Sequence, residues 1–176
     1  MIHVLIEREA IAARVAELAR EIERDTQASG PVHLVAVLKG AFVFLADLLR
    51  AIEIPVTCDF MAVSSYGDGQ VSSGVVRLTK DLDQDLAGRD VVLVEDIVDS
   101  GATLAYLQGL LRARNPRSLR TVCLLDKRSR RQVPVVIDYV GFVIDDRFVV
   151  GYGLDAGEQY RQLPFIGVPQ GETNEQ

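Results

Sequence analysis

The 176-residue chain has no tryptophan, and it contains only two cysteines, two histidines and two methionines. Cys58 and Cys123 each lie in or beside an apolar run, which favours two buried thiols over a disulfide or a metal-binding pair. The histidines and cysteines are isolated from one another, so the ligand spacing of a zinc site is missing. These absences predict a cytoplasmic domain without redox chemistry.

An excess of basic residues is missing as well. The 19 Lys and Arg are outnumbered by 25 Asp and Glu, which gives a net charge of −6. General binding to nucleic acid requires clustered Lys and Arg, so we expect no nucleic-acid partner. No apolar run approaches the ~20 residues of a membrane-spanning helix. The N-terminus carries Glu7 and Glu9 and has no cleavage site of small residues, so we expect neither a signal peptide nor a membrane partner.

The composition is that of a globular domain, with 48% hydrophobic and 25% charged residues in a length suited to one domain. Periodic apolar residues predict helices over 7–28, 41–51 and 104 to about 115. Apolar, β-branched runs predict strands over 32–38, 54–63, 75–78, 91–94, 121–125 and 135–144, followed by short strands and loops that cap the sheet. This alternation predicts an α/β fold with a mostly parallel, twisted sheet flanked by helices.

The most informative segment covers residues 91–104. A buried strand leads into two adjacent acids, Glu95 and Asp96, and a third acid, Asp99, precedes the sequence Ser-Gly-Ala-Thr at the start of a helix. The carboxyl ends of parallel strands are where α/β folds bind ligands. The N–H groups of residues 100–103, with the positive end of the helix, suit a phosphate group. The chain has no G-x-x-x-x-G-K-[ST] sequence, so this is not a Walker-type loop.

The carboxylates beside this phosphate site need a role of their own, because negative side chains repel a bound anion. Sugar hydroxyls or a bound Mg²⁺ would use them, so a phosphorylated ribose with its metal fits the whole segment. The alternative is that Asp96 and Asp99 cap the helix and Ser100 is a turn residue. That alternative explains each of these residues singly, but it does not explain why they occur together in one segment.

The segment Val94–Leu104 resembles the phosphoribosyl-pyrophosphate (PRPP) motif of the type I phosphoribosyltransferases. Three further segments resemble one branch of that superfamily, the hypoxanthine-guanine phosphoribosyltransferases, in the same order along the chain: Leu38–Gly40, Ser64–Gly67 and Val140–Leu163. The resemblance implies the type I phosphoribosyltransferase fold in a single domain.

The resemblance also divides residues 1–176 into regions. It implies a core over about 30–140 and a mobile loop over about 64–76. A small hood that recognises the base is implied over about 141–170, together with the N-terminal segment.

This family transfers the 5-phosphoribosyl group from PRPP to hypoxanthine or guanine and releases pyrophosphate, through a transition state that resembles an oxocarbenium ion. The resemblance therefore implies an enzyme of purine salvage that uses Mg²⁺ and binds PRPP and a 6-oxopurine. Members commonly form dimers or tetramers, so a homodimer or homotetramer is expected.

The resemblance also implies roles for the PRPP-binding residues. Glu95 and Asp96 engage the ribose hydroxyls, where Mg²⁺ also binds, and Asp99 acts as general acid/base at a purine nitrogen. The remaining PRPP contacts are Asp99, Ser100, Gly101, Ala102 and Thr103 at the 5′-phosphate, Leu38, Lys39, Gly40 and Arg161 at the pyrophosphate, and Ser65 and Tyr66 in the loop that covers the reacting centre. The family often has a cis peptide bond between the first two residues of the pyrophosphate turn.

The implied purine-binding residues follow the fourth of the five main predicted strands. Lys127 donates to the 6-oxo group and is counted with Asp99 as catalytic; adenine would present a donor there and be rejected. Phe148 stacks on the base, Val149 presents backbone groups to its edge, and Asp155 binds a second Mg²⁺. The arginines beside the lysine are expected to form a solvated basic cluster: Arg128, Arg130 and Arg131.

Other readings of the same motifs remain open. A xanthine phosphoribosyltransferase would use Lys127 equally well, because xanthine also carries a 6-oxo group. An adenine enzyme fits less well. A third alternative is an RNA-binding regulator of pyrimidine genes with uracil phosphoribosyl transfer as a second activity, which the net charge of −6 opposes. A fourth is an α/β binding module without catalysis, in which Asp99 and Lys127 would be incidental.

Overall fold

The computed structural model describes residues 1–26, 30–65 and 76–170. In this part of the chain, a six-stranded sheet in the order β4-β3-β2-β5-β6-β7 forms the centre, and β1 pairs with β8 in a separate ribbon. The elements are β1 (Ile2–Ile6), α1 (Arg8–Thr26), β2 (Val32–Leu38), α2 (Phe42–Ala51), β3 (Val56–Ser65), β4 (Val76–Lys80), β5 (Asp90–Val98), α3 (Ala102–Arg112), β6 (Ser118–Asp126), the 3₁₀ helix η1 (Arg128–Arg130), β7 (Tyr139–Val143) and β8 (Ile166–Pro169).

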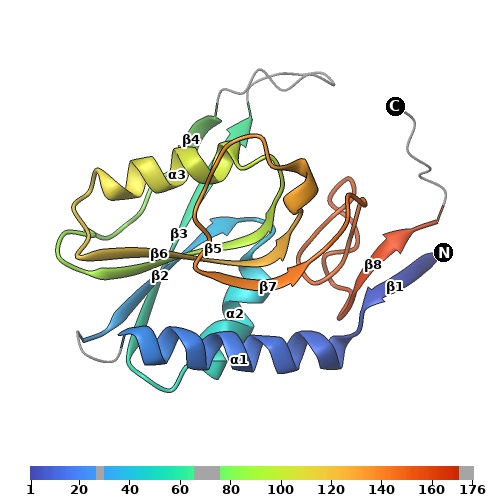
Figure 1. The fold of residues 1–176 in the computed structure, drawn as a ribbon, viewed down its shortest axis with the longest axis horizontal. Helices are drawn as coiled ribbons and strands as arrows, with labels where there is room; N and C mark the ends of the chain where they lie inside the picture. The colour runs from blue at the N-terminus through green and yellow to red at the C-terminus, as the bar shows by residue number, and fades with distance from the viewer. Residues whose placement is uncertain (27–29, 66–75, 171–176) are drawn as a thin grey trace.

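The sheet is parallel except at one edge. Strands β3, β2, β5, β6 and β7 run in the same direction, and β4 returns antiparallel to β3. Helices α1 and α2 cover one face of the sheet, and α3 covers the other (Figure 1). The predicted α/β fold with a mostly parallel sheet is therefore confirmed.

The two faces of the sheet form two apolar cores, which explains why β2 is apolar at almost every position. Leu34 packs in the core under α1 and α2, whereas Val35, its neighbour in the strand, packs in the core under α3. Successive side chains of a strand point to opposite faces, so a strand covered on both sides reads as a continuous hydrophobic run.

The chain changes direction across the sheet between β2 and β5. It moves from β2 to β3 on one side and returns to place β5 on the other side of β2. The carboxyl ends of β2 and β5 therefore lie next to each other at a topological switch point. Open α/β sheets leave a crevice at this position, because the connections leave in opposite directions.

Two expectations about strands need correction. The strand expected over 135–144 is only β7, and the backbone before it is irregular. The ribbon of β1 and β8 was not foreseen: it joins the two ends of the chain antiparallel, with Ile2 opposite Pro169. A pairing so distant in sequence leaves no local pattern to detect.

The expectation about the thiols is half correct. Cys123 in β6 is buried, and burial raises the pKa of its thiol, but Cys58 in β3 is exposed. Both are free cysteines. In the part of the chain that the structure describes, no helix is both long and apolar enough to cross a membrane.

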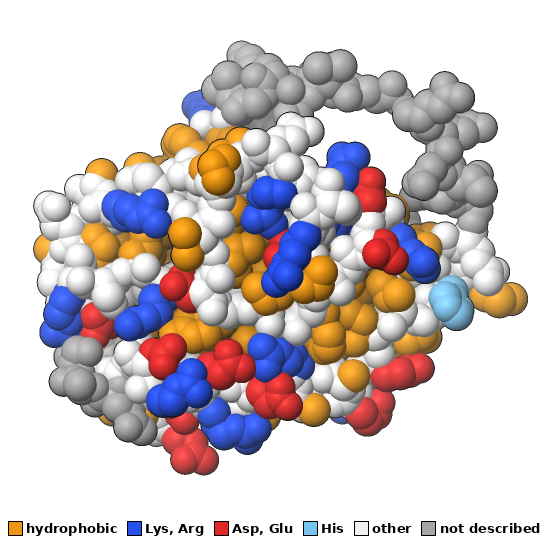
Figure 2. Space-filling model, in the orientation of Figure 1, with side chains coloured by type: hydrophobic (Ala, Val, Ile, Leu, Met, Phe, Trp, Pro, Cys, Tyr) orange, Lys and Arg blue, Asp and Glu red, His pale blue; other side chains and the backbone are white. Residues whose placement is uncertain are grey.

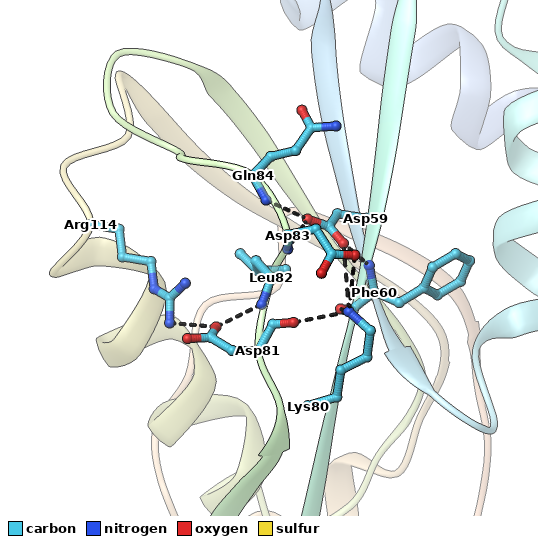
Figure 3. A network of polar contacts seen from close by, with 8 residues as sticks. All are labelled: Asp59, Phe60, Lys80, Asp81, Leu82, Asp83, Gln84 and Arg114. Atoms are coloured by element: carbon cyan, nitrogen blue, oxygen red, sulfur yellow. Dashed lines mark hydrogen bonds and ion pairs between the residues drawn. The ribbon is translucent and has the colours of Figure 1, made fainter.

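A polar network fixes the start of β3 to the connection that follows β4 (Figure 3). The Asp59 carboxylate, only 5% exposed, accepts the N–H groups of Asp83 and Gln84 at 2.8 and 3.1 Å, and that of Phe60 at 2.7 Å. Lys80 donates to the carbonyl oxygen of Phe60 at 2.9 Å and lies 3.9 Å from the same carboxylate. One buried carboxylate thus holds three backbone donors in place.

We expect Asp59→Ala to lower the free energy of unfolding by about 2 kcal/mol, because buried N–H groups lose their acceptor. Asp83→Ala is the matched control: its side chain is 81% exposed and reaches Lys80 only at 3.4 Å. Denaturation by urea measures both variants. Equal losses in the two would contradict the structural role given to Asp59.

Candidate active site

A cavity of about 250 Å³ lies at the carboxyl ends of β2 and β5, at the switch point. Most of the PRPP-binding residues expected from the sequence line it, together with four apolar residues: Val37, Leu38, Gly40, Glu95, Asp96, Ile97, Val98, Asp99, Ser100, Gly101, Thr103 and Leu104. A larger, mostly apolar hollow of about 900 Å³ lies between α1, α2 and the segment 161–164. Of the predicted site residues, only Arg161 borders that hollow.

The turn after β2 meets the carboxylates of β5 in very close packing. The peptide bond between Leu38 and Lys39 is cis. A Cβ on the next residue, Gly40, would lie 1.6 Å from Oδ2 of Asp96. A Cβ on Gly153 would lie 2.3 Å from the carbonyl oxygen of Gly40. Three separate segments therefore pack around one glycine, where no side chain fits.

Of the two adjacent acids of β5, Glu95 is buried and Asp96 is partly buried. Glu95 is 6% exposed, and burial, followed by the charge of Asp96, raises its pKa well above the usual range. Burial also raises the pKa of Asp96 to about 6; Asp155 adds to the shift, while the N–H of Ile97 and the charge of Arg161 oppose it. The charged forms of the pair are therefore poorly stabilised by the protein itself, and sugar hydroxyls or a cation would stabilise them.

The loop from Asp99 to Thr103 leads into α3 as the sequence predicts. Gly101 has φ of 88°, a left-handed conformation that glycine adopts without strain. Gly101 at the N-cap provides no side-chain hydrogen bond, but Oγ of Ser100 accepts the N–H of Ala102, the first residue of α3, at 3.3 Å. The first N–H groups of a helix have no partner within the helix, so an anion can accept them here.

Two cations predicted at the pyrophosphate site share a carboxylate. Glu158, with φ of 66°, accepts from Lys39 Nζ at 2.7 Å and from Arg161 Nη2 at 3.0 Å. The lysine contact is the main reason that the pKa of Glu158 is lowered. Arg161 also pairs with Asp155 at 2.9 Å, and its buried Nε has no hydrogen-bond partner among the described residues. That orphan donor is suited to a further anionic ligand.

The residues expected to recognise the base lie outside this cavity's lining. Lys127 is 8% exposed, and its Nζ lies 3.7 Å from Asp146. Phe148 is 46% exposed, so its ring is accessible to a stacking partner, whereas Val149 is buried. Arg130 joins the two regions, since its Nε donates to Asp99 Oδ1 at 3.1 Å and its Nη1 to Asp146 at 3.4 Å. Asp146 was missed by sequence reasoning, because two adjacent acids on an exposed segment carry no motif.

Ala102 also lies outside the lining, at the first position of α3. Ser65 ends β3. Tyr66, and most of the loop expected over 64–76, lie outside the described residues.

The expectation of a solvated arginine cluster needs correction. Arg131 is 20% exposed and Arg128 is 66% exposed, and both donate to the carboxylate of Asp126, which is 5% exposed. Arg130 is paired with Asp99 rather than with solvent alone. Arg128 and Arg130 are exposed as expected, and only Arg131 departs from the expectation. A basic run usually indicates a solvated surface, and the buried acid that precedes this one changes that outcome.

The carboxylates do not form a closed metal site. Among the described residues, no group of three or more His, Cys, Asp and Glu side chains is arranged to hold an ion. Mg²⁺ commonly binds through one or two carboxylates, with waters and substrate phosphates completing its octahedron. The desolvated pair Glu95 and Asp96, with Asp155 close enough to shift the pKa of Asp96, fits that kind of open site.

The chain matches the family model of the phosphoribosyl transferase domain over residues 5–156. It is 48% identical over 167 residues to the hypoxanthine phosphoribosyltransferase of Salmonella typhimurium, with 94% of both chains covered. It is 55% identical over 169 residues to the hypoxanthine-guanine phosphoribosyltransferase of Mycobacterium avium, covering 93% of this chain and 83% of that one. A crystal structure of a hypoxanthine-guanine phosphoribosyltransferase from Bacillus anthracis, with HEPES in its active site, aligns at 46% identity with a TM-score of 0.91, covering 96% of this chain and 99% of that one.

The raised pKa of Asp96 predicts a pH-dependent stability. Its carboxyl has a pKa of about 6 in the folded chain against about 4 when unfolded, so it favours folding at low pH and loses that contribution as pH rises through 6. Asp96→Asn mimics the protonated form. We expect this variant to be about 1 kcal/mol more stable than the parent at pH 8 and equally stable near pH 4.

Chemical denaturation in metal-free buffer at both pH values measures this difference. Asp145→Asn, at a side chain that is 87% exposed, serves as the control and should change stability at neither pH. A gain for Asp96→Asn that is the same at pH 4 and pH 8 would show that charge is not its cause.

Proposed function

The chain belongs to the phosphoribosyl transferase domain family and is a phosphoribosyltransferase, and from this premise we propose that its acceptors are the 6-oxopurines hypoxanthine and guanine. The proposed reaction joins a purine nitrogen to the anomeric carbon of PRPP and releases pyrophosphate. Its products are the nucleoside monophosphates IMP and GMP, so the reaction salvages purines.

One observation supports this function above the others. The helix-initiating loop, the desolvated carboxylates and the cis turn occupy one small cavity. The three parts suit the three parts of PRPP: its 5′-phosphate, its ribose hydroxyls and its pyrophosphate. Holding the two reactants in line, with charge placed where it develops, is the main source of rate in a loose displacement of this kind.

We assign the 5′-phosphate to Ser100, Gly101, Ala102 and Thr103, whose N–H groups begin α3. Glu95 and Asp96 accept hydrogen bonds from the ribose hydroxyls. Lys39 and Arg161 carry the pyrophosphate with the backbone of Leu38 and Gly40, and the orphan Nε of Arg161 is one donor for it. Ser65 and Tyr66 complete the assignment as residues that cover the reacting centre.

On the purine side, Asp99 holds the proton that leaves the attacking nitrogen, as general acid/base. Lys127 donates to the 6-oxo oxygen, Phe148 stacks on the ring, and Val149 offers backbone groups to its edge. The existing contacts of Lys127 and Arg130 with Asp146 must rearrange when a purine enters. A buried ammonium facing an amino group would lose its hydrogen bond, which is why adenine is rejected.

We propose Mg²⁺ as the cofactor, held by Glu95, Asp96 and Asp155 together with oxygens of PRPP. When bound, it neutralises the charge that develops on the leaving pyrophosphate. We also propose a cytoplasmic location, which agrees with two free thiols, and self-association as a homodimer or homotetramer, which sedimentation of the purified chain measures. Within the single domain, the core is assigned to about 30–140 and the hood to about 141–170 with the N-terminal segment.

The alternative of an RNA-binding regulator finds less support. On the face drawn in Figure 2, Lys and Arg side chains are interspersed with Asp and Glu instead of forming one basic patch. The net charge is −6. Phosphate contacts provide most of the affinity for RNA, so a mixed surface of this kind binds it poorly.

An assay with PRPP and Mg²⁺ that offers hypoxanthine, guanine, xanthine, adenine and uracil in parallel tests the proposed function. We expect nucleotide from hypoxanthine or guanine and none from adenine or uracil, because Lys127 requires an acceptor at position 6. Turnover of uracil alone would mean that the base site has been misassigned. Turnover of xanthine above the other two would favour the alternative specificity.

We expect Lys127→Ala to raise the KM for the purine by about 100-fold, with a much smaller change in the KM for PRPP, because the lost donor contacts only the base. Steady-state kinetics with each substrate varied in turn separates the two constants. Arg147→Ala, at a 52% exposed side chain, is the control. An equal rise in both constants would show that Lys127 acts through the structure of the site.

A further inference from the structure

A buried ion pair lies directly beneath the phosphate loop, here defined as residues 98–103. The guanidinium of Arg131 donates through Nη2 to Oδ1 of Asp126 and through Nε to the main-chain carbonyl of Asp99 at 3.2 Å. The Asp126 side chain is 5% exposed and that of Arg131 is 20% exposed. Asp126 ends β6 and directly precedes Lys127. The guanidinium of Arg131 therefore connects the phosphate loop to the end of the strand that carries Lys127, the residue proposed to recognise the base.

The backbone around Arg131 continues this contact. The N–H groups of Gln132 and Val133 both donate to the carbonyl oxygen of Ser100, at 2.9 and 3.0 Å. A Cβ on Gly101 would lie 2.6 Å from the carbonyl oxygen of Val133 and 2.9 Å from Cδ of Arg131. The segment 131–133 is therefore the floor on which the phosphate loop rests, and the glycine permits the close approach.

The base side is tied to the same loop. The N–H of Lys127 donates to the carbonyl oxygen of Val98 at 3.0 Å, and the carbonyl oxygen of Asp126 accepts the N–H of Ile144 at 3.1 Å. The loop, the lysine and the segment leading to Phe148 consequently meet at Asp126. A displacement of this residue would be transmitted to all three.

We propose that Arg131, held by Asp126, is a positioning residue that fixes the backbone of the phosphate loop for the 5′-phosphate of PRPP and of the product nucleotide. This inference rests on the proposed function. A planar guanidinium presents donors in a rigid fork and can satisfy a carboxylate and a carbonyl at once, which the single ammonium of lysine does less well. A buried carboxylate in turn requires a fixed cation, so each partner holds the other in place.

The neighbouring arginines do not share this role. Arg128 donates to the other oxygen of Asp126 at 3.1 Å, but its side chain is 66% exposed. Among the described residues, this side chain makes no hydrogen bond to the phosphate loop. Arg130 contacts the side chain of Asp99, not its main chain, and is 52% exposed. Arg128 is therefore a natural matched control, because it shares the carboxylate with Arg131 but not the carbonyl of the loop.

The experiment compares Arg131→Met, Arg131→Lys and Arg128→Met with the parent enzyme. We expect Arg131→Met to lower kcat/KM for PRPP about 100-fold, a loss typical of reacting groups displaced by about 1 Å. Arg131→Lys should recover only part of that loss. Arg128→Met should stay within about threefold of the parent, as expected for an exposed ion pair.

Binding measurements distinguish positioning from general damage. Calorimetric titration with GMP should show at least a tenfold weaker affinity for Arg131→Met than for the parent, because the 5′-phosphate site is disturbed. Titration with inorganic pyrophosphate and Mg²⁺ should be unchanged, because Lys39 and Arg161 are not touched. Equal losses for both ligands, or a kcat/KM equal to that of the parent, would overturn the proposal.

A second variant covers the case in which Arg131→Met leaves Asp126 unpaired and the chain fails to fold. Asp126→Asn with Arg131→Gln removes both charges of the pair together, so neither is left without its partner, and should show the same selective loss of GMP affinity. Should the parent enzyme transfer phosphoribosyl groups to none of the purines, the proposed function fails. The comparison of GMP with pyrophosphate then still decides the role of Arg131, since it requires no turnover.

Discussion

The close packing of three backbone segments around Gly40 is the constraint on which the site depends. The carboxylate of Asp96 occupies the space of a side chain at this position, and Gly153 rests on the carbonyl of the same residue. The turn after β2, the acids at the end of β5 and the C-terminal segment therefore meet at this glycine. One contact is made by the carboxylate of Asp96 and the other by the main chain, and both require that position 40 has no side chain.

The same packing removes much of the solvation of the two acids of β5. Burial raises the pKa of both carboxyls, and the charge of Asp96 adds to the shift of Glu95 while that of Asp155 adds to the shift of Asp96, so their charged forms are poorly stabilised by the protein alone. A cation or a set of sugar hydroxyls supplies what water no longer does. Poorly solvated charged groups of this kind are expected at binding sites, where stability is given up for binding. The sheet tolerates it because apolar cores cover both of its faces.

Sequence reasoning succeeded where the signal is local. Apolar runs marked the central strands, and the acids followed by Ser-Gly-Ala-Thr marked the loop before α3, because each feature lies within about ten residues. It failed where the determinant is distant: the pairing of β1 with β8 joins the two ends of the chain. Arginine is usually exposed, so the composition of residues 128–131 predicts a solvated run. The low exposure of Arg131 depends instead on its pairing with the buried Asp126. The exposure of Cys58 likewise depends on how its strand is covered.

Glu158 places a carboxylate of the chain itself at the cations that are proposed to hold pyrophosphate. It already occupies Lys39 and Arg161, the two cations assigned to the pyrophosphate. On the proposed assignment, binding of pyrophosphate exchanges one anion for another, and its free energy is a difference between two sets of ion pairs. The displaced carboxylate stays tethered beside the cations and competes for them throughout. Because the Lys39–Glu158 pair is largely exposed, this competition is weak, and it sets a small cost on pyrophosphate binding under the proposed assignment.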